Sequence, residues 1–283
     1  MAELVSIIIP TYNRPEALER AVQSALNQLY DQVEVLVIND GGSIKSFEGE
    51  FNDARLNFYH LEKNSGVSAA RNFGIEKAEG DFLLFLDDDD ELASNFLQDA
   101  ISEIKEPIDI LIAHSVLNGD GNDPHFRKIK KLNAELYEQY HFQSIDHWAY
   151  FLHYMPAFHS LLFRAGLFEK VKFDESISYG EDRLLMLQLK NQKVFMKSVD
   201  LLAGMYNYRQ KSLSQSHVHE FSSLARSILK DRKAIAYTRL LDAFYWNQEG
   251  RYLRFLYSMI HSLKSPHVVV KQFVLFLRLI KLR

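Results

Sequence analysis

Short apolar runs alternate with amphipathic stretches over the first 113 residues of the chain. Continuous apolar runs are typical of strands buried on both faces, whereas apolar residues at every third or fourth position indicate a helix. Their alternation predicts βαβ units, and therefore a mostly parallel central sheet flanked by helices. The expected strands are Leu4–Ile9, Val33–Ile38, Leu56–Leu61, Asp81–Leu86 and Ile108–Ala113, and the expected helices are Glu16–Leu29, Val67–Ala78 and Leu92–Ile104.

The pattern becomes less regular beyond Ala113. We expect an α/β domain over residues 1–220, with halves that divide near residue 113, and a separate helical region over 221–283. The elements expected in the second half are a helix at Ser144–Tyr154, a strand at Ser160–Phe163, a helix after Asp182, and two strand candidates at Val194–Val199 and Met205–Tyr208.

Polar residues follow three of the expected strands directly, at Thr11–Arg14, Asn39–Ser43 and Asp87–Asp90. Open α/β sheets bind ligands outside the carboxyl ends of their parallel strands. The three polar loops are therefore expected to converge on one crevice.

Four consecutive carboxylates, Asp87–Asp90, make the third loop the most distinctive one. Crowded carboxylates repel one another, and a hard divalent cation with oxygen ligands is a natural compensation. The alternative is a solvated acidic turn before a helix, where acids are also favoured. A calcium EF-hand loop beginning at Asp87 is excluded, because Leu92 stands where that motif needs Gly and Gln98 where it needs Glu.

Composition narrows the class of protein. With 47% hydrophobic and 25% charged residues, the chain has an ordinary globular composition. The absence of cysteine excludes disulfides and thiolate metal sites. We expect neither a signal peptide nor a membrane-spanning helix, because the sequence begins with a strand-like run and has no long uncharged apolar stretch.

Charge separates the C-terminal region from the rest. From Arg226 onward there are 12 Lys and Arg against three Asp and Glu, in a chain whose net charge is −4. Residues 251–283 have seven basic residues and no acid, with helical apolar spacing on both sides of Pro266. Such a cationic amphipathic region suits an anionic membrane surface. The alternatives are a helix packed on the main domain or in a homo-oligomer interface. No nucleic-acid-binding motif accompanies the charge, so no nucleic-acid partner is expected.

Five segments in order resemble family 2 glycosyltransferases of the GT-A fold, over roughly Val5 to Asn191. The resemblance implies a Rossmann-like fold and an inverting transfer of a sugar, of the hexosyl or N-acetylhexosaminyl class, from a UDP-sugar to an acceptor hydroxyl. It further implies a glycan or lipid-linked acceptor in bacterial polysaccharide or glycolipid synthesis, and a cytoplasmic location with peripheral membrane contact. On this view, 1–113 is the nucleotide-sugar half and 114–220 the acceptor half. The segments are VSIIIPTYNR, VINDGGS, NSGVSAARNFGI, FLDDDDEL and FDESISYGEDRLL.

The resemblance also implies a donor site. Tyr12 and Asp40 would contact the base, and Arg71 the diphosphate. Asp89 would ligate Mn²⁺ or Mg²⁺, while Asp87 would hold the ribose or sugar. This four-acid run departs from the commoner family form, which has a small residue at its second position. The residues expected to bind donor are Pro10, Thr11, Tyr12, Arg14, Asp40, Gly66, Arg71, Asp87, Asp88, His159 and Arg209, and the expected metal ligands are Asp89 and His217.

Glu181-Asp182 matches the acidic pair of the family's acceptor side. The match makes Asp182 the general base and Glu181 its neighbouring helper. Simpler structural interpretations stay open: a helix cap for Asp182, a turn for Asp40 and a salt bridge for Arg71. The rival functions are a catalytically inactive nucleotide-sugar-binding module and another nucleotide-sugar enzyme of related fold. A nucleotidyltransferase is disfavoured, since no glycine-rich basic loop follows the first strand.

Overall fold

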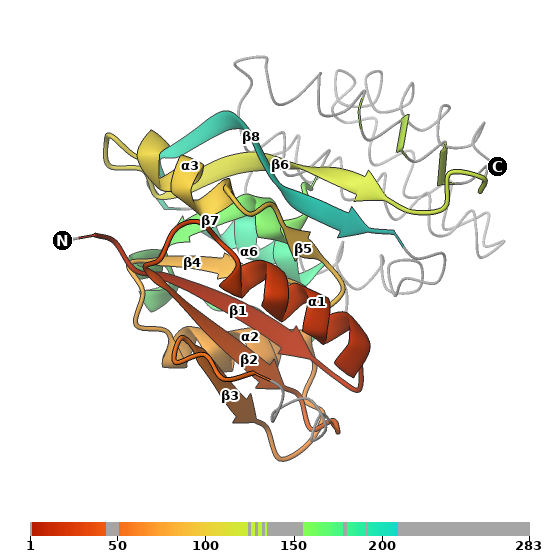
Figure 1. Cartoon of the computed structure of the whole chain (residues 1–283). Coiled ribbons are helices and arrows are strands. Elements are labelled where there is room, and N and C mark those ends of the chain that lie inside the picture. Colours follow the sequence, from red (N-terminus) through yellow and green to blue (C-terminus); the bar gives the residue numbers. More distant parts are fainter. Residues whose placement is uncertain are drawn as a thin grey trace, which may run out of the picture.

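The computed structural model describes residues 2–43, 51–123, 155–177, 180–190 and 192–208, together with 126–127, 130–131 and 134. In this part of the chain, eight strands form one sheet with helices on both faces (Figure 1). The strands are β1 (Val5–Thr11), β2 (Val33–Asn39), β3 (Leu56–His60), β4 (Phe82–Phe85), β5 (Glu91–Leu92), β6 (Ile110–Asn118), β7 (Leu161–Arg164) and β8 (Met196–Asn207). The helices are α1 (Pro15–Leu26), α2 (Val67–Lys77), α3 (Phe96–Glu103) and α6 (Glu181–Leu189), with short 3₁₀ turns at Phe158–Ser160 and Ala165–Glu169.

The strand order is β3-β2-β1-β4-β7-β6-β8-β5. The first half of the sheet, β3-β2-β1-β4, is parallel throughout, as the sequence predicts. The second half is mixed: β7 runs antiparallel to both β4 and β6, β6 pairs parallel with β8, and β5 pairs antiparallel with β8. The predicted α/β class is thus confirmed, with its parallel character concentrated in the first half.

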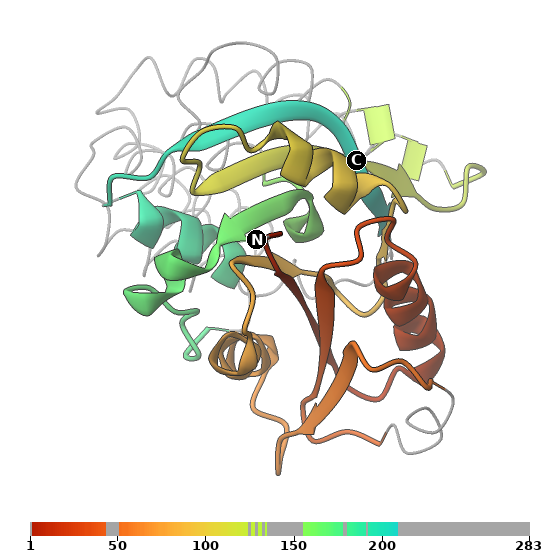
Figure 2. The same cartoon turned by 60° about the vertical axis from the view of Figure 1, so that its left-hand side comes forward.

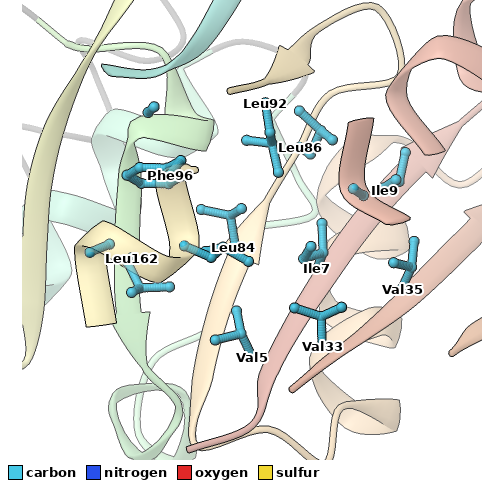
Figure 3. Close-up of a cluster of buried hydrophobic side chains, with 14 of the residues drawn as sticks. Val5, Ile7, Ile9, Val33, Val35, Leu84, Leu86, Leu92, Phe96 and Leu162 are labelled. Atoms are coloured by element: carbon cyan, nitrogen blue, oxygen red, sulfur yellow. The ribbon is translucent and has the colours of Figure 1, made fainter. Parts of the chain in front are cut away.

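Two hydrophobic cores lie on opposite faces of the sheet. Successive residues of a strand point to opposite faces, so Ile7 and Ile9 of β1 pack with α1 and α3 (Figure 3), while Ile8 packs with α2 and α6. Figure 2 shows α1 and α2 on the two sides of the sheet. The two cores fix the parallel strands, and the polar loops at their carboxyl ends, in one position.

Local sequence explains the helix contacts. Pro15 begins α1, at the position where a missing N–H costs no hydrogen bond. Gly74 lets α2 approach β1 closely, since a Cβ at this residue would lie 2.5 Å from a methyl group of Ile8.

Two boundaries predicted from the sequence are wrong. The strand candidates Val194–Val199 and Met205–Tyr208 both overlap one continuous strand, β8, which begins at Met196 and ends at Asn207. The helix expected from Leu92 begins only at Phe96, because Glu91 and Leu92 pair with β8 first. Gly204 permits that pairing, since any Cβ there would overlap the carbonyl oxygen of Glu91.

Several expectations fall outside the described residues: the helix at Ser144–Tyr154, the two site residues Arg209 and His217, and the region 221–283. Within the described residues, no helix combines the length and apolar character needed to cross a membrane.

Candidate active site

The three polar loops meet at one edge of the sheet, as the sequence predicts. Thr11 at the end of β1 pairs in register with Asn39 at the end of β2. The backbone N–H of Asp40 donates to the carbonyl of Thr11 at 2.9 Å, and the side-chain oxygen of Asn13 accepts from the N–H of Ser43 at 2.7 Å. The acidic turn follows β4, which is the other neighbour of β1.

Asp88 is the anchor of the acidic turn. It is buried, and its two carboxylate oxygens accept hydrogen bonds from Thr11 Oγ1 at 2.8 Å and Arg14 Nη1 at 2.9 Å. Burial raises the pKa of Asp88 above its ordinary value, although Arg14 opposes that shift. This geometry differs from the expected donor contact, because Asp88 faces inward and holds the first loop against the turn.

Asp87 and Asp89 are the more accessible members of the turn, with side chains 38% and 19% exposed. Arg14 Nη1 lies 3.5 Å from Asp89 Oδ2. From β8, the side-chain amide of Asn207 donates to the carbonyl of Asp89 at 2.6 Å. Arg14 and Asn207 therefore hold the turn, and the carboxylates of Asp87 and Asp89 are accessible to ligands.

Asp90 begins a buried hydrogen-bonded chain. One carboxylate oxygen lies 3.1 Å from His159 Nδ1, and the other accepts the backbone N–H of Asn207 at 2.8 Å. His159 Nε2 in turn lies 2.8 Å from the hydroxyl of Ser115. Burial raises the pKa of Asp90 to about 6. His159 is 1% exposed and both its nitrogens are engaged, so the direct donor contact expected from the sequence is not supported by this geometry.

Arg71 joins the acidic turn to α6. Its Nη2 lies 2.7 Å from Asp87 Oδ1, and its Nη1 lies 2.8 Å from Glu181 Oε1. The guanidinium is buried and lies 5.3 Å from the ring centroids of both Phe158 and Phe173. This is the salt bridge that the sequence left open as an alternative, and contact of Arg71 with a diphosphate stays a prediction.

Gly180, Glu181 and Asp182 form the start of α6. Gly180 takes a left-handed conformation, φ 76°, which glycine adopts without strain and which turns the chain into the helix. Asp182 Oδ1 accepts the N–H of Arg183 at 2.7 Å. Burial, with the nearby charge of Glu181, raises the pKa of Asp182 to about 6. A carboxylate that titrates near neutral pH suits general acid–base chemistry.

A cavity of about 300 Å³ brings the two acidic segments together. Tyr206 of β8 lies beside these acids, and burial together with the carboxylates of Asp90 and Asp87 raises its pKa above the ordinary value. The polar residues that line the cavity are Arg71, Asp87, Ser115, Glu181, Asp182, Arg183 and Tyr206, and the other lining residues are Leu117, Met155, Pro156, Ala157, Phe158 and Gly180.

The expected base-binding residues lie in the loops after β1 and β2. The carboxylate of Asp40 is buried and accepts the N–H groups of Ser65 at 2.7 Å and Gly66 at 2.8 Å, so it holds the start of α2. Pro10 is buried in β1, whereas the ring of Tyr12 is 45% exposed. Tyr12 is thus accessible for stacking, and Asp40 has a structural role as well as its predicted one.

The acidic turn fits a divalent cation that is shared with a substrate. Within the described residues, no three His, Asp or Glu side chains are grouped so that they could enclose a metal ion. Mg²⁺ and similar ions, however, are commonly held by one or two carboxylates together with substrate phosphates. The accessible carboxylates of Asp87 and Asp89 provide that kind of donor set.

The sequence prediction missed three residues of the site: Ser115, Tyr206 and Asn207. His114 and Ser115 interrupt an otherwise apolar run, and this interruption was the available signal. Tyr206 and Asn207 gave no comparable signal, because their role depends on how β8 reaches the acidic turn.

Comparison with known proteins connects this site to a family. Residues 6–172 match the family model described as glycosyl transferase family 2. A glycosyltransferase of Streptococcus pneumoniae, GlyA, is 29% identical over 231 residues, covering 76% of this chain and 32% of that protein. The Campylobacter jejuni GalNAc(5)-diNAcBac-PP-undecaprenol beta-1,3-glucosyltransferase is 28% identical over 199 residues, covering 68% of this chain and 61% of the relative.

The fold also matches a solved structure. The crystal structure of S. aureus TarS 1–349 in complex with UDP-GlcNAc superposes with a TM-score of 0.63 at 21% identity, covering 89% of this chain and 73% of that one. This likeness supports the GT-A fold. The chain spans about a third and about three fifths of the lengths of the two curated relatives.

Proposed function

The chain belongs to glycosyl transferase family 2, and we propose that it is an inverting enzyme that moves a sugar from a UDP-sugar to an acceptor hydroxyl. The observation that carries this proposal is the shared cavity of Asp87 and Asp182. Asp87 belongs to the acidic turn expected to bind donor, and Asp182 has a pKa of about 6. A donor-side acid and a candidate base therefore face one space.

In the proposed step, Asp182 takes the proton from the acceptor hydroxyl. The hydroxyl oxygen attacks the anomeric carbon from the face opposite the diphosphate, and the bond between that carbon and the diphosphate oxygen breaks. UDP leaves with the bonding electrons, and the configuration at the anomeric carbon inverts. Asp182 suits the step because it is both accessible from the cavity and a stronger base than an ordinary aspartate.

The remaining residues bind and orient. Tyr12 offers an exposed ring for base stacking, and the carboxylate of Asp40 fixes the backbone at Gly66. Arg71 holds Asp87 and Glu181 in place. Asp89, with the diphosphate oxygens, would hold Mn²⁺ or Mg²⁺, which when bound neutralises charge on the departing UDP.

For the donor we propose a UDP-hexose or UDP-N-acetylhexosamine, and for the acceptor a glycan or lipid-linked saccharide. The name of the Campylobacter jejuni relative, which specifies an undecaprenol-linked acceptor, supports the latter. The basic region 251–283 would bring the enzyme to an anionic membrane surface at the cytoplasmic side, which supports access to such an acceptor.

The test compares Asp182→Asn with Asp120→Asn, a matched change at an exposed aspartate. Binding of UDP-GlcNAc and UDP-glucose is measured by calorimetry with Mn²⁺, and turnover by release of UDP. We expect Asp182→Asn to bind donor like the wild type and to lose at least 100-fold in turnover, since general-base catalysis contributes about 10²–10⁴. Wild-type turnover in this variant would refute the assignment of the base.

The same assays, together with an assay for pyrophosphate release, test the rival functions. A catalytically inactive module would bind a UDP-sugar but release no UDP in the wild type. A nucleotidyltransferase would consume a sugar 1-phosphate and release pyrophosphate, which we expect not to occur.

A further inference from the structure

We propose that the hydroxyl of Ser115 accepts a hydrogen bond from a sugar hydroxyl in the cavity, and that His159 and Asp90 position it for this task. The inference rests on the proposed function and deepens it, because it assigns a specificity-determining residue to the same site. The sugar hydroxyl could belong to the donor or to the acceptor, and the test below separates the two.

The three side chains form a continuous chain that ends in the cavity. Asp90 Oδ2 lies 3.1 Å from His159 Nδ1, and His159 Nε2 lies 2.8 Å from Ser115 Oγ. Asp90 and His159 are 2% and 1% exposed, whereas Ser115 is half-buried and lines the cavity. Only the serine can therefore touch a ligand, and the other two act through it.

The chemistry of the chain sets the direction of its hydrogen bonds. A carboxylate accepts hydrogen bonds and donates none, so we assign the single N–H of the imidazole to Nδ1 of His159, which faces Asp90. Nε2 is then an acceptor, and the hydroxyl proton of Ser115 is committed to it. Ser115 thus presents lone pairs to the cavity and requires a ligand that donates.

The strand geometry brings Ser115 to this position. The register between β6 and β8 shifts on both sides of His114, with partners Ser198, Leu202 and Gly204 for Ile112, His114 and Ser115. Irregular pairing of this kind redirects side chains and is frequent beside active sites. The shift places Ser115 opposite Gly204, near the segment of β8 that also holds the acidic turn.

The rest of the cavity suits a sugar ring. The carboxylates of Asp87 and Asp182 and the hydroxyl of Ser115 can accept hydrogen bonds from several hydroxyl groups, and the guanidinium of Arg71 balances part of the negative charge of the acids. Leu117, Met155 and Phe158 supply an apolar wall, which suits the C–H face of a pyranose. A ring with hydroxyl edges and apolar faces matches both features.

The first arm of the test examines the donor. Calorimetry with Mn²⁺ compares UDP, UDP-glucose and UDP-GlcNAc on the full-length wild type, on Ser115→Ala, and on Ser102→Ala as a control at an exposed serine. We expect UDP to bind all three proteins within twofold. If the donor supplies the hydroxyl, Ser115→Ala binds the UDP-sugar about tenfold more weakly, as expected for one lost hydrogen bond.

The second arm examines the acceptor. UDP release is measured with octyl glycosides of glucose, galactose and N-acetylglucosamine, and the KM for each glycoside that stimulates the wild type is compared. If the acceptor supplies the hydroxyl, Ser115→Ala raises that KM about tenfold and leaves the KM for donor unchanged. A purely structural role would weaken UDP and every sugar together and would lower Tm.

Substrate analogues test the proton direction. On the sugar identified, the contacting hydroxyl is replaced by hydrogen or by fluorine, which accepts hydrogen bonds but cannot donate one. We expect both analogues to lose about tenfold on the wild type and nothing on Ser115→Ala. Retained binding of the fluoro analogue would mean that Ser115 donates and would overturn the proposal.

Ser115→Cys is the second variant, should Ser115→Ala fold poorly. Its thiol keeps a similar shape but is a weak acceptor, so the same loss is expected. Suppose that the wild type binds a UDP-sugar and releases UDP. The proposal is then overturned if both variants have wild-type affinity and KM for every sugar. Failure of the wild type to bind any UDP-sugar would instead refute the proposed function.

Discussion

Nη1 of Arg71 lies 2.8 Å from Oε1 of Glu181, across 110 residues of sequence, in a site where the guanidinium is 3% exposed. The other end of the guanidinium binds Asp87. One buried cation therefore stands between the acidic turn and the acidic pair of α6. Without it, the two carboxylates would repel each other.

Arg71→Met should destabilise the protein by about 3 kcal/mol, because removing one partner of a buried ion pair leaves uncompensated charge. Urea unfolding at pH 7 measures the change. Lys172→Met is the matched control: its partner Glu76 and the lysine are both more than half exposed, so a loss of less than about 1 kcal/mol is expected. Equal effects of the two changes would contradict the interpretation of Arg71.

Turnover should depend on the protonation of Asp182. Its pKa is raised to about 6, so the basic form that accepts a proton is lost as pH falls through about 6. We expect kcat/KM to decline tenfold per pH unit below that value and to be level above it. The profile is measured between pH 5 and pH 8 with a constant Mn²⁺ concentration. A value of kcat/KM that stays level down to pH 5 would show that Asp182 is not the titrating base.

Asp182→Asn should also make the protein more stable at neutral pH. A carboxyl whose pKa is higher in the folded state holds its proton more tightly there, so its contribution to stability falls as pH rises from about 4 to 6. The amide of Asp182→Asn is neutral at every pH and avoids this loss. Above pH 6 we therefore expect its free energy of unfolding to exceed that of the wild type by on the order of 2 kcal/mol. Urea unfolding at pH 4 and pH 8 tests it: the gain should appear at pH 8 and largely vanish at pH 4.

Gly204→Ala should disturb the acidic turn from a distance. The new methyl group would overlap the carbonyl of Glu91, so β5 and β8 would have to separate, at about 1–3 kcal/mol. Gly166→Ala is the control, because a Cβ there meets no atom within 4 Å. The Tm of the protein and its affinity for UDP-GlcNAc should both fall for Gly204→Ala and stay unchanged for Gly166→Ala. If Gly204→Ala is less stable but binds UDP-GlcNAc as the wild type does, the pairing of β8 does not influence the donor site.

Sequence-based prediction worked best where the environment of a residue is decided by the residues next to it in sequence, and worst where it is decided by contacts with distant segments. Apolar runs located β1, β2, β3 and β4, and their polar endings correctly predicted that the three polar loops lie together. Ser115 could not be found in this way, because its position depends on a register shift against β8, more than 80 residues later. Similarly, four adjacent aspartates look alike in sequence, yet Asp88 and Asp90 face inward while Asp87 and Asp89 stay accessible.

β8 has a consequence for protein engineering. A chimaera could join the first part of this chain to the second part of a relative, with a junction near residue 113, where the sequence analysis divides the domain. Here, however, the acidic turn of the first half is fastened by Asn207, and β5 is paired to β8 beside Gly204. A chimaera that keeps residues 1–113 would therefore inherit the acids without the strand that holds them. To transfer donor preference between two enzymes, β8 should therefore be taken from the same enzyme as residues 1–113.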